Sequence, residues 1–275
     1  MRLFRALVKK GLLDGRWTLG LSSLSLFGLS WMFVYVAARI ERSLAEAQAE
    51  GRAPRAGMFR GMGGAAMDFS TAAIQMAFWK HPFVILTIAI WAIARGTAAV
   101  GGELERGSMD IILSRPVSRT TYLMSQVVTA LVGLGVLVSA LVLGNVLGSM
   151  AVGLSSPVSA KILARPGMNL YAMGVIMFGY TLLFSSVDSV RWRPNLLGSV
   201  ATLVGFILQI VVNLPTLEDW KWLGKYSIFS AYDPVEAVVK GEKYLFNSSV
   251  LLGLGLVLVA LSAASFSRRD LPTPG

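Results

Sequence analysis

Residues 102–122 read GELERGSMDIILSRPVSRTTY, and the rest of the chain is arranged around this stretch. Charged residues, a glycine and a proline are concentrated here between two long apolar runs. Gly107 followed by Ser108 predicts the start of a short helix, because a serine oxygen can cap free backbone donors. Asp110 suits the first turn of that helix, where a negative charge is favourable. Pro116 should end it, since the residue before a proline is pushed out of helical geometry.

The predicted short helix covers residues 108–115 and is amphipathic. Its apolar side carries Ile111, Ile112 and Leu113, which can meet lipid or the ends of membrane spans. The charged side should face water or a protein partner. The charged residues expected on that side of the stretch are Glu103, Glu105, Arg106, Asp110 and Arg119.

The composition indicates that this helix lies at a membrane. Of 275 residues, 55% are hydrophobic and 15% are charged, with a mean hydropathy of +0.64, whereas a soluble domain carries about 25% charged residues. The fold class predicted is therefore an all-α polytopic membrane protein. The basic segment 1–16 precedes an apolar stretch long enough to span, so we expect an anchor rather than a cleaved signal peptide. The chain has no cysteine, which excludes disulfides and thiolate metal sites.

Six apolar stretches are long enough to cross a bilayer, which requires about 20 helical residues. The predicted spans are residues 17–40, 82–100, 123–152, 170–187, 196–214 and 248–266. Residues 1–16 alternate apolar and basic positions at helical spacing and predict an amino-terminal interfacial helix. Residues 69–79 predict a second interfacial helix, and the helix of the first span should continue through 41–50. Connections are expected at residues 51–68, 154–169, 188–195 and 215–247.

Two features inside the spans predict packing or pairing. Arg95, near the polar end of the second span, should extend to the interface or pair with Glu103 or Glu105. Gly144 and Gly148 in the third span are four residues apart, a spacing that lets helices approach closely in lipid.

The distribution of basic residues predicts the orientation. If both termini are cytoplasmic, the inner segments hold twelve Lys or Arg in 54 residues, and the longer outer segments hold eleven. Basic residues favour the cytoplasmic side, so both termini and residues 101–121 are expected there. Topology also accounts for the net charge of +10, and we expect no nucleic-acid partner.

The central stretch resembles the signature of ABC-2 type permeases, the membrane subunits of type-2 ABC exporters. In that pattern an acidic pair precedes a glycine, a later acidic residue and a Pro-Val-Ser-Arg ending. Ser108 stands where the pattern has threonine, and an aspartate replaces the commoner later glutamate. The matching residues are Glu103 and Glu105, Gly107, Asp110, and then Pro116, Ser118 and Arg119.

The resemblance implies that residues 1–275 form a single ABC-2 type transmembrane domain in the inner (cytoplasmic) membrane. It implies a cytoplasmic coupling helix that contacts a separate ABC ATPase subunit, and a translocation pathway enclosed by two permease copies or paralogues. ATP and magnesium would bind to the ATPase, so this chain would carry no cofactor and no metal. The residues expected to couple to the ATPase are Glu103, Glu105, Arg106, Gly107, Ser108, Asp110, Arg115, Pro116 and Arg119.

Other functions remain open on the residues alone. The chain has no phosphate-binding loop, so it is not itself the ATPase. His81 is the only histidine and lacks partners for a metal or catalytic site. The alternatives are an integral membrane enzyme or a scaffold that recruits a soluble partner, and a retained nucleotide-hydrolysing partner would favour the exporter. The residues do not identify the substrate. An apolar translocation pathway with few polar groups, such as Asn145, Gln209 and Asn213, is compatible with lipids, amphipathic drugs, peptides or a lipid-linked glycan.

Overall fold

The computed structural model describes residues 2–50, 75–114, 116–154, 157–214 and 216–269. In these ranges the chain is helical and contains no β-strand. Six of the described helices are long and apolar enough to cross a membrane, which confirms the all-α polytopic prediction. They are α2 (Arg16–Ala49), α4 (Pro82–Ala99), α7 (Arg119–Val152), α8 (Ala160–Val187), α9 (Trp192–Asn213) and α11 (Tyr244–Arg268).

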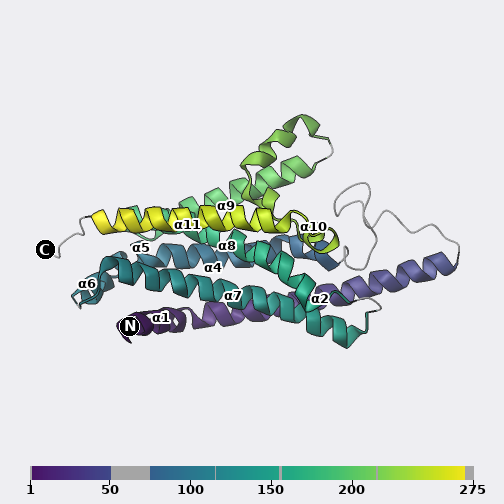
Figure 1. The fold of residues 1–275 in the computed structure, drawn as a ribbon, viewed down its shortest axis with the longest axis horizontal. Helices are drawn as coiled ribbons and strands as arrows, with labels where there is room; N and C mark the ends of the chain where they lie inside the picture. Colours follow the sequence, from purple (N-terminus) through teal and green to yellow (C-terminus); the bar gives the residue numbers. More distant parts are fainter. Residues whose placement is uncertain (1, 51–74, 115, 155–156, 215, 270–275) are drawn as a thin grey trace.

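The long helices lie side by side around α8, which packs against α4, α7, α9 and α11 (Figure 1). Helix α2 packs along α7, and the short amino-terminal helix α1 (Arg2–Asp14) also rests on α7. Helix α9 is the least buried of the six. Both chain termini lie at the end of the bundle that also carries α5 (Gly101–Glu105) and α6 (Ser108–Leu113) (Figure 1). An even number of spans produces this arrangement.

The glycine pair in α7 brings two helices into close contact. A Cβ at Gly144 would fall on the carbonyl oxygen of Phe27, and one at Gly148 would lie 3.2 Å from the Cα of Trp31. Both partners belong to α2, so the backbones of α2 and α7 meet along this face. The expectation of close approach at these glycines is confirmed.

The polar connection expected at residues 154–169 is wrong for most of its length, because α8 already begins at Ala160. Pro166 lies inside this helix, where it removes one backbone donor. Prolines are tolerated in membrane helices when neighbouring groups satisfy the freed carbonyl. The third and sixth spans likewise begin earlier than expected, at Arg119 and Tyr244.

The end of the bundle opposite the termini is built from short helices within the expected connection 215–247. These are η4 (Glu218–Tyr226), η5 (Ile228–Ala231) and α10 (Pro234–Val239). The short helix η3 (Phe78–Lys80), which precedes α4, is bonded to this group. The hydroxyl of Tyr232 donates to the carbonyl of Trp79 at 3.1 Å, and Lys80 pairs with Asp233 at 3.1 Å.

The structure describes only part of the region predicted before α4. The loop at residues 51–68 and the first part of the helix at 69–79 lie outside the described residues. His81 precedes α4 as its N-cap, where its Nδ1 accepts the amide of Phe83 at 3.3 Å. This histidine therefore begins a helix and fixes the first turn of α4.

Candidate functional site

The segment between α4 and α7 is fastened to its neighbours where it leaves α4. Val100 departs from helical geometry and separates α4 from α5. The amide of Gly101 donates to Ser185 Oγ at 2.9 Å, and the same hydroxyl donates to the carbonyl of Thr97 at 3.1 Å. From the other side, the buried hydroxyl of Tyr122 donates to the carbonyl of Ala99 at 2.8 Å. Helices α4, α7 and α8 are thus joined at the base of the segment.

Glu103 is the polar centre of the segment. Arg106 Nη2 lies 2.6 Å from Glu103 Oε1, and Ser108 Oγ donates to both the carboxylate and the backbone carbonyl of Glu103. Lys10 of α1 adds a cation 3.8 Å away. These contacts close the chain from residue 103 to residue 108 into a compact turn.

The expectation that Glu103 faces water is wrong, because its exposed fraction is 7%. Burial opposes its ionisation, but the hydrogen bond from Ser108 and the charges of Lys10 and Arg106 outweigh burial and hold the pKa of Glu103 below its ordinary value. The sequence could not reveal this environment, because Lys10 lies far away along the chain.

Glu105 and Arg106 are exposed, as expected. Glu105 Oε2 accepts the backbone amide of Arg191 at 2.7 Å, and this bond connects the segment to the turn between α8 and α9. Three elements distant in sequence therefore hold α5 in place: α1 through Lys10, α8 through Ser185, and the turn before α9 through Arg191.

Gly107 adopts a left-handed conformation with φ of 67° and reverses the chain before α6. The predicted capping role of Ser108 is wrong: no side chain caps α6, and the Ser108 hydroxyl bonds to Glu103 instead. Within α6, Met109 is fully buried and Ile112 is half-buried against the core. Ile111 points away from that side and is 68% exposed, next to the exposed Asp110.

The sequence identified the apolar positions of α6 but not the one that remains exposed. Residues three apart share a helix face, so the pairing of Met109 with Ile112 is the signal that could have singled out Ile111. Helix α6 ends at Leu113, and Arg115 lies outside the described residues. The following Pro116 is exposed.

The start of α7 is fixed to the carboxyl end of the chain. Ser118 caps α7 by accepting the amide of Thr121 at 3.1 Å. Arg119 donates to the carbonyl of Arg269, so it is half-buried rather than free in water. The guanidinium of Arg269 in turn donates to the carbonyl of Asp188 at 2.8 Å and to Ser189 Oγ at 2.5 Å.

Among the described residues, Arg95 forms no ion pair with Glu103 or Glu105, which was one of the two environments expected for it. Its Nη2 donates to Gln126 Oε1 at 3.0 Å, and its guanidinium carbon lies 5.8 Å from the ring centroid of Trp91. An amide and an aromatic face thus replace the carboxylate partner.

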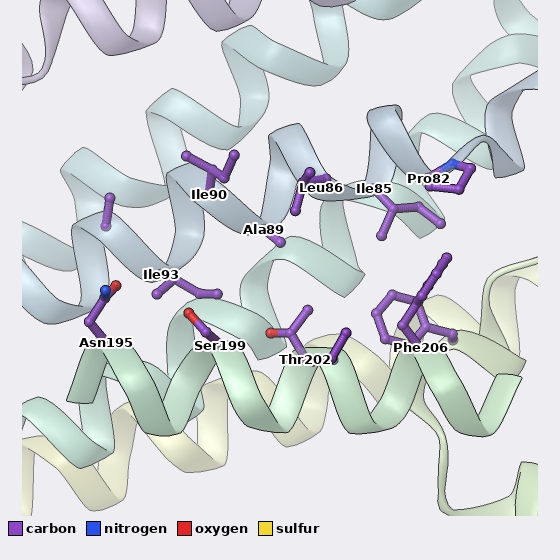
Figure 2. A pocket seen from close by; sticks show the side chains of 13 residues that line it. Pro82, Ile85, Leu86, Ala89, Ile90, Ile93, Asn195, Ser199, Thr202 and Phe206 are labelled. Carbon is purple, nitrogen blue, oxygen red and sulfur yellow. The ribbon is translucent and has the colours of Figure 1, made fainter. Parts of the chain in front are cut away.

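A second feature is an apolar groove of about 480 Å³ between α4 and α9. Figure 2 shows side chains of the two helices directed toward each other across it. Its polar groups lie along one face of α9, at Asn195, Ser199 and Thr202, and Thr202 also bonds to Tyr180 at 2.5 Å. By contrast, Asn145, an expected polar group of the pathway, is buried within the bundle.

The segment therefore combines a bonded base with an exposed tip. Among the described residues, no cluster of three His, Cys, Asp or Glu side chains could hold a metal ion. The compact turn can transmit a force from its tip to the membrane spans, because its base is bonded to α4, α7 and α8.

A family model described as "ABC-2 family transporter protein" matches residues 10–271, nearly the whole chain. None of the curated proteins matches the chain.

Proposed function

The chain belongs to the ABC-2 family of transporter proteins, and from this premise we propose that it is the membrane-spanning subunit of an ATP-driven exporter. In this proposal a separate ABC ATPase subunit binds ATP and magnesium and hydrolyses the nucleotide. Helix α6 is the coupling helix that contacts that subunit. The chain itself carries out no catalytic step.

The observation that carries the proposal is the exposed tip of α6. Ile111 is a large apolar side chain left 68% exposed; Asp110 lies exposed next to it in the chain, and Arg106 is exposed earlier in the same segment. An apolar anchor surrounded by charges is typical of a protein-binding surface, where the charges fix the orientation of the partner.

The bonds at the base of the segment explain how movement of α6 would reach the spans. Tyr122 joins α7 to the end of α4, and Ser185 joins α8 to α5. A force on α6 therefore acts on three spans together and favours a rigid-body tilt over local bending. Closure of the ATPase subunits would use this tilt to switch the pathway from inward to outward access.

The groove between α4 and α9 is our candidate for one wall of the translocation pathway. It is lined mainly by apolar side chains, and α9 is the least buried span, so a second permease copy or a paralogue has an open face to cover. In this arrangement the protein lies in the inner membrane, with α6 and both termini on the cytoplasmic side.

Co-purification tests the proposal. The tagged chain is isolated from its native membranes in mild detergent, and vanadate-sensitive ATP hydrolysis is measured in the eluate. Ile111→Asp and the double variant Glu105→Gln/Arg106→Gln should reduce the retained hydrolysis at least about tenfold, because hot-spot side chains contribute about 2 kcal/mol or more. Arg193→Gln, an exposed change at the same end of the bundle, serves as the control.

The outcomes separate the candidate functions. Retention of the ATPase by wild type and Arg193→Gln, with loss in the α6 variants, supports coupling through α6. An eluate without nucleotide hydrolysis excludes the exporter, and a retained partner that hydrolyses no nucleotide would favour the scaffold instead.

A further inference from the structure

A polar cavity of about 600 Å³ lies beneath the coupling segment, at the end of the bundle that holds both termini. Its walls come from α1, the start of α2, α4, α5, α6, α7 and the turn before α9. Ligand sites of proteins commonly have volumes of about 300–1,000 Å³. The cavity is thus large enough for a small organic anion.

The lining of the cavity is rich in positive charge. Among the described residues that line it, four are cationic and two are anionic. The cations are Lys10, Arg95, Arg106 and Arg191, and the anions are Asp14 and Glu103. The lining therefore has an excess of two positive charges.

Both carboxylates are already paired with other cations. Lys10 lies 3.4 Å from Asp14, and Arg106 lies 2.6 Å from Glu103. Among the described residues, these pairs leave Arg95 and Arg191 as the two cations of the lining that form no ion pair of their own. Arg191 is exposed, whereas Arg95 lies deeper, within the membrane-spanning helix α4.

Arg95 is the charge that most needs an anion. Its Nε is buried and has no hydrogen-bond partner among the described residues, and its only side-chain hydrogen bond goes to the neutral amide of Gln126. Arg95 is half-buried, and the carboxylates that attract it, Asp14 and Glu103, form their ion pairs with other cations, so a bound anion would stabilise its charge.

Two glycines at the junction of α1 and α2 bring the backbone close to this arginine. A Cβ at Gly11 would lie 3.2 Å from Arg95 Nη2, and one at Gly15 would lie 3.1 Å from Trp91. The fold thus places α1 directly over the guanidinium and keeps a cavity beside it.

We propose that this cavity binds a phosphate-bearing anion, with Arg95 as its deep ligand and Arg191 as its ligand at the rim. A guanidinium presents a planar fork of donors that matches phosphate oxygens, and such charge-assisted bonds are strong. The cavity lies at one end of the spans, so the phosphate can come from a lipid headgroup or from a water-soluble phosphate. The site shares Glu103 and Arg106 with the coupling segment, but binding to it does not require an ATPase.

The test uses the full purified chain in a neutral detergent, and thermal unfolding is followed as ligand is added. One arm adds dihexanoyl phosphatidic acid, with dihexanoyl phosphatidylcholine as the neutral-headgroup control. The other adds inorganic phosphate, with chloride at matched ionic strength. A ligand that binds the folded state raises the unfolding temperature in a saturable way, which yields an apparent Kd.

We expect saturable binding in at least one arm. Arg95→Gln and Arg191→Gln should each weaken it by about tenfold, as the loss of one charge-assisted hydrogen bond implies. Arg193→Gln is the matched control, because this exposed arginine is two residues from Arg191 and does not line the cavity. It should leave the Kd unchanged.

Binding of phosphatidic acid alone identifies a lipid headgroup, and arginine-dependent binding of inorganic phosphate identifies a soluble source. Both results support the site. Absence of saturable binding in both arms overturns the proposal, and so does a Kd unaffected by the two variants. If Arg95→Gln does not fold, the exposed Arg191→Gln decides the question. ATPase retention is measured separately, so failure here is distinguishable from failure of the proposed coupling.

Discussion

Glu103 shows how a single side chain can organise a turn. Its two carboxylate oxygens hold Arg106 and Ser108, so the chain folds back on itself between α5 and α6. Burial alone would favour the neutral acid. The hydrogen bonds from Ser108 and Arg106, together with the charge of Lys10, reverse that preference and keep the pKa low.

The lowered pKa of Glu103 predicts a pH-dependent contribution to stability. Ionised Glu103 stabilises the folded state at pH values above 4.5, its ordinary pKa, and this contribution is lost as the pH falls through the lower folded-state pKa. Glu103→Gln should lower the free energy of unfolding at pH 7, because it removes the charge that holds Arg106 and Lys10. The loss should be about 1 kcal/mol, since both cations are partly solvated.

Thermal unfolding of both proteins between pH 7 and pH 3 checks this prediction. The difference between wild type and Glu103→Gln should persist to pH 5 and shrink as the pH falls below 4.5. Asp110→Asn, an exposed carboxylate on the same segment, serves as the control and should change little. A difference that stays constant down to pH 3 would contradict the assigned ionisation.

At the scale of elements, the packing of α2 on α7 depends on the absence of side chains. Gly144 lies against the backbone of Phe27, and Gly148 lies against Trp31. In lipid no hydrophobic effect drives helices together, so close backbone contact supplies much of the attraction. This contact anchors the first span, and with it the neighbouring helix α1 above the polar cavity.

Gly144→Ala should therefore destabilise the protein by about 1–3 kcal/mol, because the added methyl group forces the two backbones apart. Gly135→Ala is the matched control in α7, since its Cβ would meet only Tyr171 at 4.0 Å. Unfolding in mixed micelles with increasing denaturing detergent provides the measurement. Equal stability of the two variants would show that α2 and α7 separate without cost.

At the scale of the whole molecule, α1, α5, α6 and both termini share one end of the bundle, and α10 lies at the other (Figure 1). This arrangement makes the proposed orientation a single choice between two alternatives. If α6 is cytoplasmic, α10 lies on the opposite side of the membrane.

The absence of cysteine makes this choice directly testable. Ser114→Cys, just after α6, should react with a membrane-impermeant maleimide in inside-out vesicles and not in intact spheroplasts. Lys240→Cys, exposed at the end of α10, should show the reverse pattern. Labelling of Ser114→Cys from outside would reverse the orientation and exclude contact between α6 and a cytoplasmic ATPase.

The sequence by itself determined that the chain is a helical membrane protein with six spans and a charged, glycine- and proline-bounded turn after the second. Length and hydropathy are local properties, and so are the breakers around Gly107 and Pro116. The order of the residues around Gly107 also indicated the ABC-2 family, which the match over residues 10–271 confirms. The start of α8 could not be located in this way, because Pro166 is a local helix breaker that tertiary packing accommodates.

Only the tertiary structure decided which groups meet. Glu103 pairs with Lys10 because the fold brings α1 close to α5, and Arg95 contacts Gln126 because α7 lies beside α4. The exposure of Ile111 and the face of α9 that lines the groove both depend on how each helix is rotated about its axis. Rotation and pairing are set by contacts between residues distant in sequence, and the hydropathy of a nearly uniform apolar span does not encode them.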